Sequence, residues 1–266
     1  MNVRFAKAHG LGNDFILVDA GLAPAEPQPW ARRLCDRHVG IGGDGLLLVD
    51  SRGADRIGMR LFNADGSEAE ISGNGVRCVA AWGVHRGVVG LRHLVDTVAG
   101  PRPVEVEPMA GTRYRVGTDL GTPLQDGPLS EPLEAAGRQL QVTTTSLGNP
   151  HCAVFMTEPP PDEVLQVLGP AIEHHPRFPA RTNVEFVSVV SRSELRVRMW
   201  ERGVGYTRSS GTGAASAAAA AVLHGFVNRR VSVACDGGVL DVHWPLGDTL
   251  RQLGEAELLF EGEWLA

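Results

Sequence analysis

Lysine is almost absent from this sequence, and basic residues do not outnumber acidic ones. Lys7 is the sole lysine, and 25 lysines and arginines stand against 31 aspartates and glutamates, for a formal net charge of -6. General nucleic-acid binders usually present a basic face, so this balance disfavours them and favours a small-molecule partner. Enzymes that use pyridoxal phosphate hold it as a lysine Schiff base, and a lone lysine near the N-terminus disfavours that cofactor.

Cysteine is scarce and long apolar runs are missing. No CxxC spacing of a zinc or redox site is present, and we expect buried, reduced thiols at Cys35, Cys78, Cys152 and Cys235. The first residues lack the basic segment and apolar core of a secretion signal. The longest apolar stretch, Ala214–Leu223, is too short to cross a bilayer. We therefore expect a cytoplasmic protein that binds no metal and no membrane.

The second half of the chain repeats features of the first. Residues 59–87 align without gaps on residues 197–225, an offset of 138 (197 − 59), and both segments contain an S-G-x-G tetrapeptide and end in glycine. The segment GLGNDFILVD from Gly10 resembles SLGNPHCAVF from Ser146, an offset of 136 (146 − 10). Two ordered matches at nearly the same offset indicate an internal duplication rather than chance recurrence of a Gly-rich motif.

Each half combines short strands with one long helix. Runs of β-branched residues bounded by Gly, Asp or Pro predict strands, and two helices are predicted to follow the S-G-x-G tetrapeptides and to end at glycines. The predicted strands are Phe15–Val18, Gly45–Val49, Ile57–Phe62, Val104–Val106, Ala153–Met156, Val184–Val190, Glu194–Trp200, Val231–Ala234 and Val239–His243. The predicted helices are Trp30–Cys35, Gly75–Arg86, Pro161–Leu168 and Gly213–His224. The pattern predicts an α+β protein of two pseudo-symmetric lobes, each with its long helix packed on or inside the strands.

The two lobes are expected to divide the chain near its middle. Residues 1–113 form the predicted N-terminal lobe and residues 114–255 the C-terminal lobe. The segment Pro101–Arg115, with its Pro and Gly, is the expected crossover. The closing stretch Ala256–Trp264 has the pattern of a strand, and we expect residues 256–266 to return to the first lobe.

The repeated helix starts are the first candidates for a binding site. A helix start leaves backbone N–H groups unpaired and carries the positive end of the helix dipole, and glycines let an anion approach the backbone. Ser72 and Ser210 open the two tetrapeptides. We expect the two starts to face each other across a cleft between the lobes, one of them holding a substrate carboxylate. The alternative is that S-G-x-G only caps each helix, as serine often does without a ligand.

Polar side chains lie close to these turns in the sequence. Five asparagines can donate and accept hydrogen bonds, which suits the carboxylate and ammonium groups of an amino acid, although each could instead serve a turn: Asn13, Asn63, Asn74, Asn149 and Asn183. His151 lies in the second LGN loop, and a lone histidine is more often structural than catalytic. Glu201 and Arg202, in W-E-R-G, can bind ammonium and carboxylate respectively. As exposed ions they would contribute little to stability.

Six segments, in order, resemble the signature segments of the diaminopimelate epimerase family: HGLGNDF, RHVGIGGDG, FNADGSEAEISGNGVRC, SLGNPH, RTNVEF and WERGVGYTRSSGTGA. They span nearly the whole chain and are highly specific as a set. The resemblance implies two lobes, each a β-barrel-like mixed sheet around a central helix, and a tendency to form homodimers. It also implies cofactor-independent epimerisation of LL-diaminopimelate to the meso form, on the route to lysine and peptidoglycan. In that family one thiolate removes the α-proton and an opposite thiol delivers another.

The resemblance carries site residues onto this sequence. It implies acid/base roles at Ser72 and Ser210, and supporting catalytic roles for His151 and Glu201. Substrate contacts are implied at Asn13, Asn63, Gly73, Asn74, Asn149, Asn183, Arg202, Gly211 and Thr212. No metal or cofactor is implied.

This chain departs from the family at both acid/base positions. The family reads CGNG and ACGTG where Ser72 and Ser210 stand, and Cys78 cannot simply replace Ser72, because it lies six residues further on within the helix. A cysteine at a helix start can ionise near neutral pH, whereas a serine needs a partner base. The family's acidic residue in GAGET is Tyr206 here, which implies different recognition of the distal end of the substrate.

Serine at both positions leaves several functions open. The chain can be an epimerase with weak or altered chemistry on diaminopimelate or a related amino acid. It can be a lyase or isomerase that uses His151 or Glu201 as its single base, or a non-catalytic amino-acid-binding protein. The two serines fit either a subfamily with other chemistry or the deliberate replacement of both acid/base residues.

Overall fold

The computed structural model describes residues 2–265, which form two compact units. Unit 1 contains the residues up to 119 together with those from 253 onward, and unit 2 contains residues 120–252. Among the described residues, no helix is long and apolar enough to cross a membrane. The division into two lobes expected from the sequence, after residues 113 and 255, stays a prediction.

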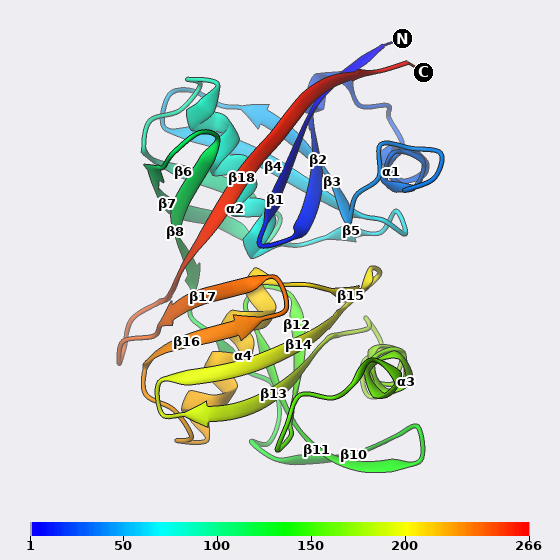
Figure 1. Cartoon of the computed structure of the whole chain (residues 1–266), viewed down its shortest axis with the longest axis vertical. Coiled ribbons are helices and arrows are strands. Elements are labelled where there is room, and N and C mark those ends of the chain that lie inside the picture. Colours follow the sequence, from blue (N-terminus) through cyan, green and yellow to red (C-terminus); the bar gives the residue numbers. More distant parts are fainter. Residues whose placement is uncertain (1, 266) are drawn as a thin grey trace. The chain divides into compact units, whose positions relative to one another are not determined.

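Unit 1 is a ring of eight strands around a helix (Figure 1). Neighbouring strands pair in the order β1–β2–β3–β4–β6–β7–β8–β18, and β18 also pairs with β1, which closes the ring. The β2–β3 and β4–β6 pairs are parallel. The elements are β1 (Val3–Gly10), β2 (Asn13–Asp19), the 3₁₀ turn η1 (Ala20–Leu22), α1 (Pro27–Cys35), β3 (Gly45–Ser51), β4 (Arg56–Asn63), β5 (Glu68–Ala69), α2 (Gly73–His85), β6 (Arg92–Thr97), β7 (Gly100–Pro108), β8 (Arg113–Gly121) and β18 (Leu250–Trp264).

Unit 2 repeats this order of elements. Its strands pair in the order β10–β11–β12–β13–β14–β16–β17, and the β12–β13 and β14–β16 pairs are parallel, like their counterparts in unit 1. The elements are β9 (Leu124–Gln125), β10 (Glu131–Ala135), β11 (Arg138–Ser146), β12 (Pro150–Phe155), α3 (Asp162–Glu173), β13 (Asn183–Ser191), β14 (Glu194–Glu201), β15 (Gly205–Thr207), α4 (Gly211–Leu223), β16 (Arg230–Cys235) and β17 (Gly238–His243).

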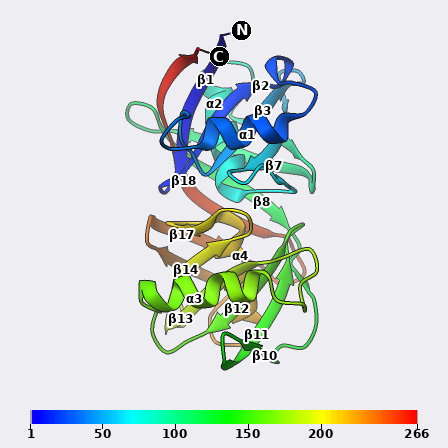
Figure 2. The same cartoon turned by 90° about the vertical axis from the view of Figure 1, so that its right-hand side faces the viewer.

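The long helices α2 and α4 are enclosed by strands, whereas α1 and α3 cover outer faces (Figure 2). Residues 73–81 of α2 and 211–221 of α4 are all buried. A helix that is apolar on every side belongs in an interior, and the alanine run of α4 lets the surrounding strands approach closely. The helix α1 packs on the outer face of the β2–β3–β4 region with Ile16, Leu46 and Phe62. The two-lobed α+β fold and the duplication expected from the sequence are confirmed.

The ends of α2 and α4 confirm that the terminal glycines stop these helices. Gly87 and Gly225 have φ of +67° and +72°, a left-handed conformation that glycine adopts without steric cost. Their N–H groups donate to the carbonyls of Val84 and Val222, at 3.0 and 2.9 Å. Both helices therefore end in the same type of cap.

The expected crossover Pro101–Arg115 is wrong. These residues form β7 and the beginning of β8, inside unit 1, and the chain passes to unit 2 only after residue 119. Proline lacks the N–H that a strand donates, which is why this segment looks irregular in the sequence. Pro101 and Pro103 lie where β7 is in register with β6, before its pairing with β8 begins at Val104.

Candidate active site

The start of α4 brings a serine and a carboxylate together. Ser210 is the N-cap residue, and its Oγ accepts a hydrogen bond from the N–H of Gly213 at 3.2 Å. The same hydroxyl donates to Oε2 of Glu201 at 3.0 Å. Ser210 is buried and Glu201 half-buried. A carboxylate in this position can take the serine proton, so this hydroxyl has the partner base that a serine needs.

The turn that carries Glu201 is held from two sides. Thr207, on β15, donates from Oγ1 to Oε1 of Glu201 at 2.7 Å, so that both carboxylate oxygens are oriented. Glu173, at the end of α3, is buried and accepts from the N–H of Gly203 at 3.0 Å and from Nε1 of Trp200 at 2.8 Å. Glu173 therefore anchors the W-E-R-G turn to α3.

A histidine–carboxylate pair lies beside the same helix start. His151 Nδ1 is 2.7 Å from Oε1 of Glu185, and both side chains are almost completely buried. On the other side of the ring, His151 Nε2 is 2.9 Å from Oδ1 of Asn149, whose Nδ2 donates to Oγ1 of Thr212 at 3.3 Å. Burial raises the pKa of Glu185, although His151 partly offsets this effect. The pair orients Asn149 toward the first turn of α4.

Asn183 links the LGN loop of unit 2 to the W-E-R-G turn. Its Nδ2 donates to the carbonyl of Pro150 at 2.9 Å, and its Oδ1 accepts from the N–H of Arg202 at 3.0 Å. Arg202 Nη1 donates to the carbonyl of Ala180 at 3.3 Å. Seven predicted site residues of unit 2 thus belong to one group of neighbouring, hydrogen-bonded segments: Asn149, His151, Asn183, Glu201, Arg202, Ser210 and Thr212.

The start of α2 has the same backbone cap but different neighbours. Ser72 Oγ accepts from the N–H of Gly75 at 3.1 Å, and its φ and ψ of -132° and 124° nearly equal those of Ser210, -134° and 130°. Among the described residues, no side-chain carboxylate or histidine accepts from the Ser72 hydroxyl. Asn74 Nδ2 donates to Oδ1 of Asn13 at 3.0 Å, so these two predicted site residues are joined.

A charged cluster behind Asn13 fixes that side chain. Asn13 Nδ2 donates to Oδ2 of Asp44 at 2.8 Å, and Arg37 donates to both Asp44 and Asp14. Burial raises the pKa of Asp44, and the negative charge of Asp14 adds to this effect. For Asp14, burial alone would raise the pKa, but hydrogen bonds from Arg37 and Lys7 outweigh it and lower the pKa to about 2. Lys7 is therefore a buried structural cation, 2.5 Å from Asp14.

Three further residues singled out from the sequence have contacts of other kinds. Asn63, at the end of β4, donates to Oγ of Ser67 at 3.1 Å. Burial raises the pKa of Cys78 to about 12, so this thiol does not ionise near neutral pH. Tyr206 donates to Asp236 at 2.9 Å, and the guanidinium of Arg198 lies 5.3 Å from the centre of its ring. No group of three or more metal-ligating side chains occurs within residues 2–265.

Sequence reasoning missed three carboxylates that hold the site: Glu185, Glu173 and Asp44. The alternation of a strand places Glu185 on the same face as Asn183, which was a usable signal. Asp44 lies in the quoted segment RHVGIGGDG, but nothing in the sequence indicated its contact with Asn13. Glu173 ends a helix whose relation to the W-E-R-G turn only the fold establishes.

Comparison with known proteins agrees with this geometry. The family model described as "Diaminopimelate epimerase" matches residues 5–123 and 143–259. A diaminopimelate epimerase of Pelotomaculum thermopropionicum is 45% identical over 98% of this chain and 99% of its own length. Another, of Desulforudis audaxviator, is 45% identical over 99% of both chains.

A solved structure shares the fold at low sequence identity. It is a hydroxyproline epimerase of Agrobacterium vitis with a TM-score of 0.79 and 15% identity, and the match covers 98% of this chain and 92% of that one. The repeated helix starts, the polar groups around them and the near full-length match to the relatives lead to one assignment. The chain belongs to the diaminopimelate epimerase family of isomerases.

Proposed function

We propose that this protein is a cofactor-independent amino-acid epimerase that converts LL-diaminopimelate to the meso form in lysine biosynthesis. The observation that carries the proposal is the pair of equivalent helix starts, each with a serine at its N-cap and asparagines beside it. Backbone N–H groups at a helix start suit a substrate carboxylate, and asparagine and glutamate side chains suit an ammonium group.

In the proposed proton route, Glu201 is the final acceptor of the first proton. When the α-C–H bond breaks, its proton passes to Oγ of Ser210 while the Ser210 hydroxyl proton passes to Oε2 of Glu201, 3.0 Å away. The electron pair left on the substrate is delocalised into the α-carboxylate. Ser72 then delivers its hydroxyl proton to the opposite face of the α-carbon and recovers a proton from solvent, while Glu201 releases to solvent the proton that it received. This route requires both serines to reach one α-carbon, as the sequence repeat predicts.

The remaining predicted residues have binding roles in this proposal. Asn13, Asn63, Gly73 and Asn74 act from unit 1, and Asn149, Asn183, Arg202, Gly211 and Thr212 from unit 2. His151 orients Asn149 and is held by Glu185. Because a serine hydroxyl is a far weaker acid than a thiol, we expect turnover to be slow with serines in place of the thiols.

Assembly and localisation are part of the same proposal. We infer a homodimer, which the exposed side chains of Leu259 and Phe260 near the end of β18 support. Cytoplasmic localisation is supported by the four cysteines, all of them free thiols, since that compartment keeps thiols reduced.

The test is exchange of the α-proton in deuterated water. Incubation with LL-diaminopimelate, or with each of a panel of smaller amino acids, should give slow deuterium uptake at the α-carbon, which mass spectrometry measures. The opposite configuration should form at the same time. Uptake without inversion, with a new product, would favour a lyase or another isomerase that uses Glu201 or His151 alone. Binding by calorimetry with no uptake from any amino acid would favour a non-catalytic binding protein.

A further inference from the structure

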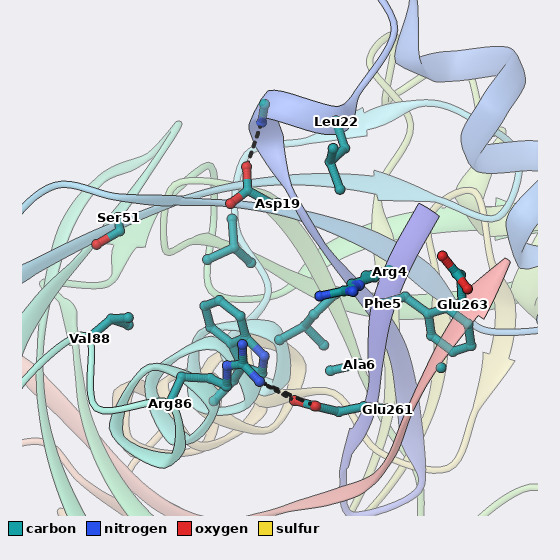
Figure 3. Close-up of a pocket in the computed structure, with 15 residues that line it drawn as sticks. Arg4, Phe5, Ala6, Asp19, Leu22, Ser51, Arg86, Val88, Glu261 and Glu263 are labelled. Carbon is teal, nitrogen blue, oxygen red and sulfur yellow. Dashed lines mark hydrogen bonds and ion pairs between the residues drawn. The ribbon is translucent and has the colours of Figure 1, made fainter. Parts of the chain in front are cut away.

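A pocket of about 990 Å³ opens at the end of the unit 1 barrel (Figure 3). It lies where α2 ends, with Trp82 and Arg86 among its lining residues. Ser72 caps the opposite end of this 13-residue helix, about 20 Å away at 1.5 Å per residue. The pocket is therefore separate from the candidate active site.

The corresponding end of α4 in unit 2 is filled by aromatic side chains. His224 stacks on Phe226 with ring centres 4.7 Å apart, and Phe155 meets both rings edge-on at 5.1 Å. Thr143 Oγ1 lies 2.8 Å from Nε2 of His224 and ties this aromatic group to β11. Three aromatic rings thus occupy the end of the unit 2 helix.

The internal repeat shows which residues of unit 1 stand where unit 2 has these aromatic side chains. The two repeat offsets place Asp19 opposite Phe155 and Arg86 opposite His224, and one residue beyond the aligned segment Val88 lies opposite Phe226. All three unit 1 residues line the pocket. In the reverse sense, Trp82 of unit 1 lies opposite Ala220. The pocket thus lies where unit 1 lacks the three rings of Phe155, His224 and Phe226, although Trp82 and Phe5 line it.

The lining combines an apolar surface with one free cation. Leu17, Val49 and Trp82 supply apolar surface. The guanidinium of Arg4 points toward the middle of the pocket (Figure 3). Glu263 is its cross-strand neighbour on β18, but no hydrogen bond or ion pair joins Arg4 to any of residues 2–265. Two charged neighbours are already engaged. Arg86 pairs with Glu261 at 3.3 Å, and Asp19 Oδ1 accepts from the N–H of Gly21 at 2.8 Å.

We propose that this pocket binds a small organic acid with an aromatic or branched apolar group. The apolar group replaces the missing aromatic side chains and packs on Trp82, Leu17 and Val49. The carboxylate accepts hydrogen bonds from the guanidinium of Arg4, whose planar N–H groups match a carboxylate. Asp19, Glu261 and Glu263 also line the pocket, and their negative charges disfavour a second negative charge on the ligand. The volume lies within the usual range for small-molecule sites.

The probes are 3-phenylpropionate, 4-methylpentanoate and the neutral 3-phenylpropionamide, measured by calorimetry and ligand-observed NMR with the full-length protein. The two acids should bind with dissociation constants in the low millimolar range or tighter. The amide should bind about tenfold more weakly, because it lacks the charge that Arg4 meets. The substitution R4Q should weaken both acids by a similar factor, whereas R113Q, at an exposed position outside the pocket, should leave binding unchanged.

The substitution V88F should fill the pocket as Phe226 fills unit 2, and should abolish binding of all three probes. Failure of both acids to bind would overturn the proposal, as would equal binding of acid and amide that R4Q leaves unaltered. Sedimentation that showed V88F to dissociate a dimer would mean that a second copy of the chain occupies the pocket, which would also overturn it. A lack of epimerase activity has no bearing on these measurements.

Discussion

The starts of α2 and α4 have the same backbone conformation but different side chains around the capping serine. Ser72 and Ser210 have nearly the same φ and ψ, and each accepts from the N–H three residues on, at 3.1 and 3.2 Å. Of the two hydroxyls, that of Ser210 alone donates to a carboxylate within residues 2–265, and this carboxylate belongs to Glu201. The position that corresponds to Glu201 in unit 1, by the offset of 138, is Asn63, which cannot accept a proton as a base.

The buried strand residues near these helix starts also differ between the units, being titratable in unit 2 and apolar in unit 1. His151 and Glu185 form a buried, hydrogen-bonded pair in unit 2, and the strand registers place Phe15 and Leu47 at the corresponding positions of unit 1. Both are buried apolar side chains. The duplication has therefore kept the same helix-start backbone in both units, but among the described residues it places a carboxylate against the capping serine in unit 2 alone.

The largest expected effect comes from restoring thiols at both helix starts. Ser72→Cys together with Ser210→Cys should raise α-proton exchange by about 10²-fold or more, because a helix start lowers a thiol pKa toward neutrality and each acid/base group contributes about 10²–10⁴-fold. Neither single change should suffice for inversion, which needs an acid and a base on opposite faces.

Deuterium uptake across the amino-acid panel measures this effect. Ser232→Cys, on β16, is the control for an added thiol and should change nothing. If the double variant folds and binds an amino acid but exchanges no α-proton, the site is not an epimerase site that lacks only its thiols.

Removal of the carboxylate beside Ser210 tests the asymmetry directly. Glu201→Gln keeps the size of the side chain but cannot take a proton from the hydroxyl, so residual exchange in the serine protein should fall by about 10²-fold. Glu194→Gln, at the exposed start of the same strand, should leave exchange unaltered. Equal exchange by Glu201→Gln and the parent protein would remove Glu201 from the proton route.

The third test replaces the buried His151–Glu185 pair of unit 2 with apolar side chains like those of unit 1. His151→Phe alone leaves Glu185 buried and unpaired, which should cost about 3–5 kcal/mol, and adding Glu185→Leu should recover most of that loss. Burial holds the pKa of Glu185 above its ordinary value in the folded protein. Stability contributed by a raised pKa is lost as pH rises through it, so the stability of His151→Phe should fall as pH rises above the ordinary range of a carboxyl group.

Urea unfolding and hydrogen exchange of the β12–β13 amides measure this effect, because the two units need not unfold together. A double variant that is no more stable than His151→Phe would show that the pair is not coupled.

A smaller effect is expected from Asp14 in unit 1, whose pKa is lowered from 3.8 to about 2. Stability from a lowered pKa is present above the ordinary value and is lost as pH falls through the lowered one. The parent protein should therefore lose about 2 kcal/mol between pH 4 and pH 2 from this group. Asp14→Asn should lack this part of the acid dependence in urea titrations. Identical acid profiles for the two proteins would exclude Asp14 as the titrating group.

The sequence alone determined the family resemblance, the duplication and both helix starts. These rest on local rules: serine caps a helix, glycine ends one with positive φ, and strands show alternating burial. The sequence also predicted the closing strand at Ala256–Trp264, and these residues form the second part of β18 (Leu250–Trp264).

Only the tertiary structure decided which groups touch these helix starts. Glu201 and Ser210 are nine residues apart in sequence and meet because β15 returns the chain to the start of α4. Glu185 meets His151 across 34 residues because β12 and β13 pair in parallel. Local sequence preferences specify turns and caps, but strand register fixes which distant side chains become neighbours. The register brings Glu201 to Ser210 in unit 2, and the equivalent register in unit 1 places Asn63 at the corresponding position. The lack of a carboxylate partner for Ser72 among the described residues is therefore a difference of sequence and not of register.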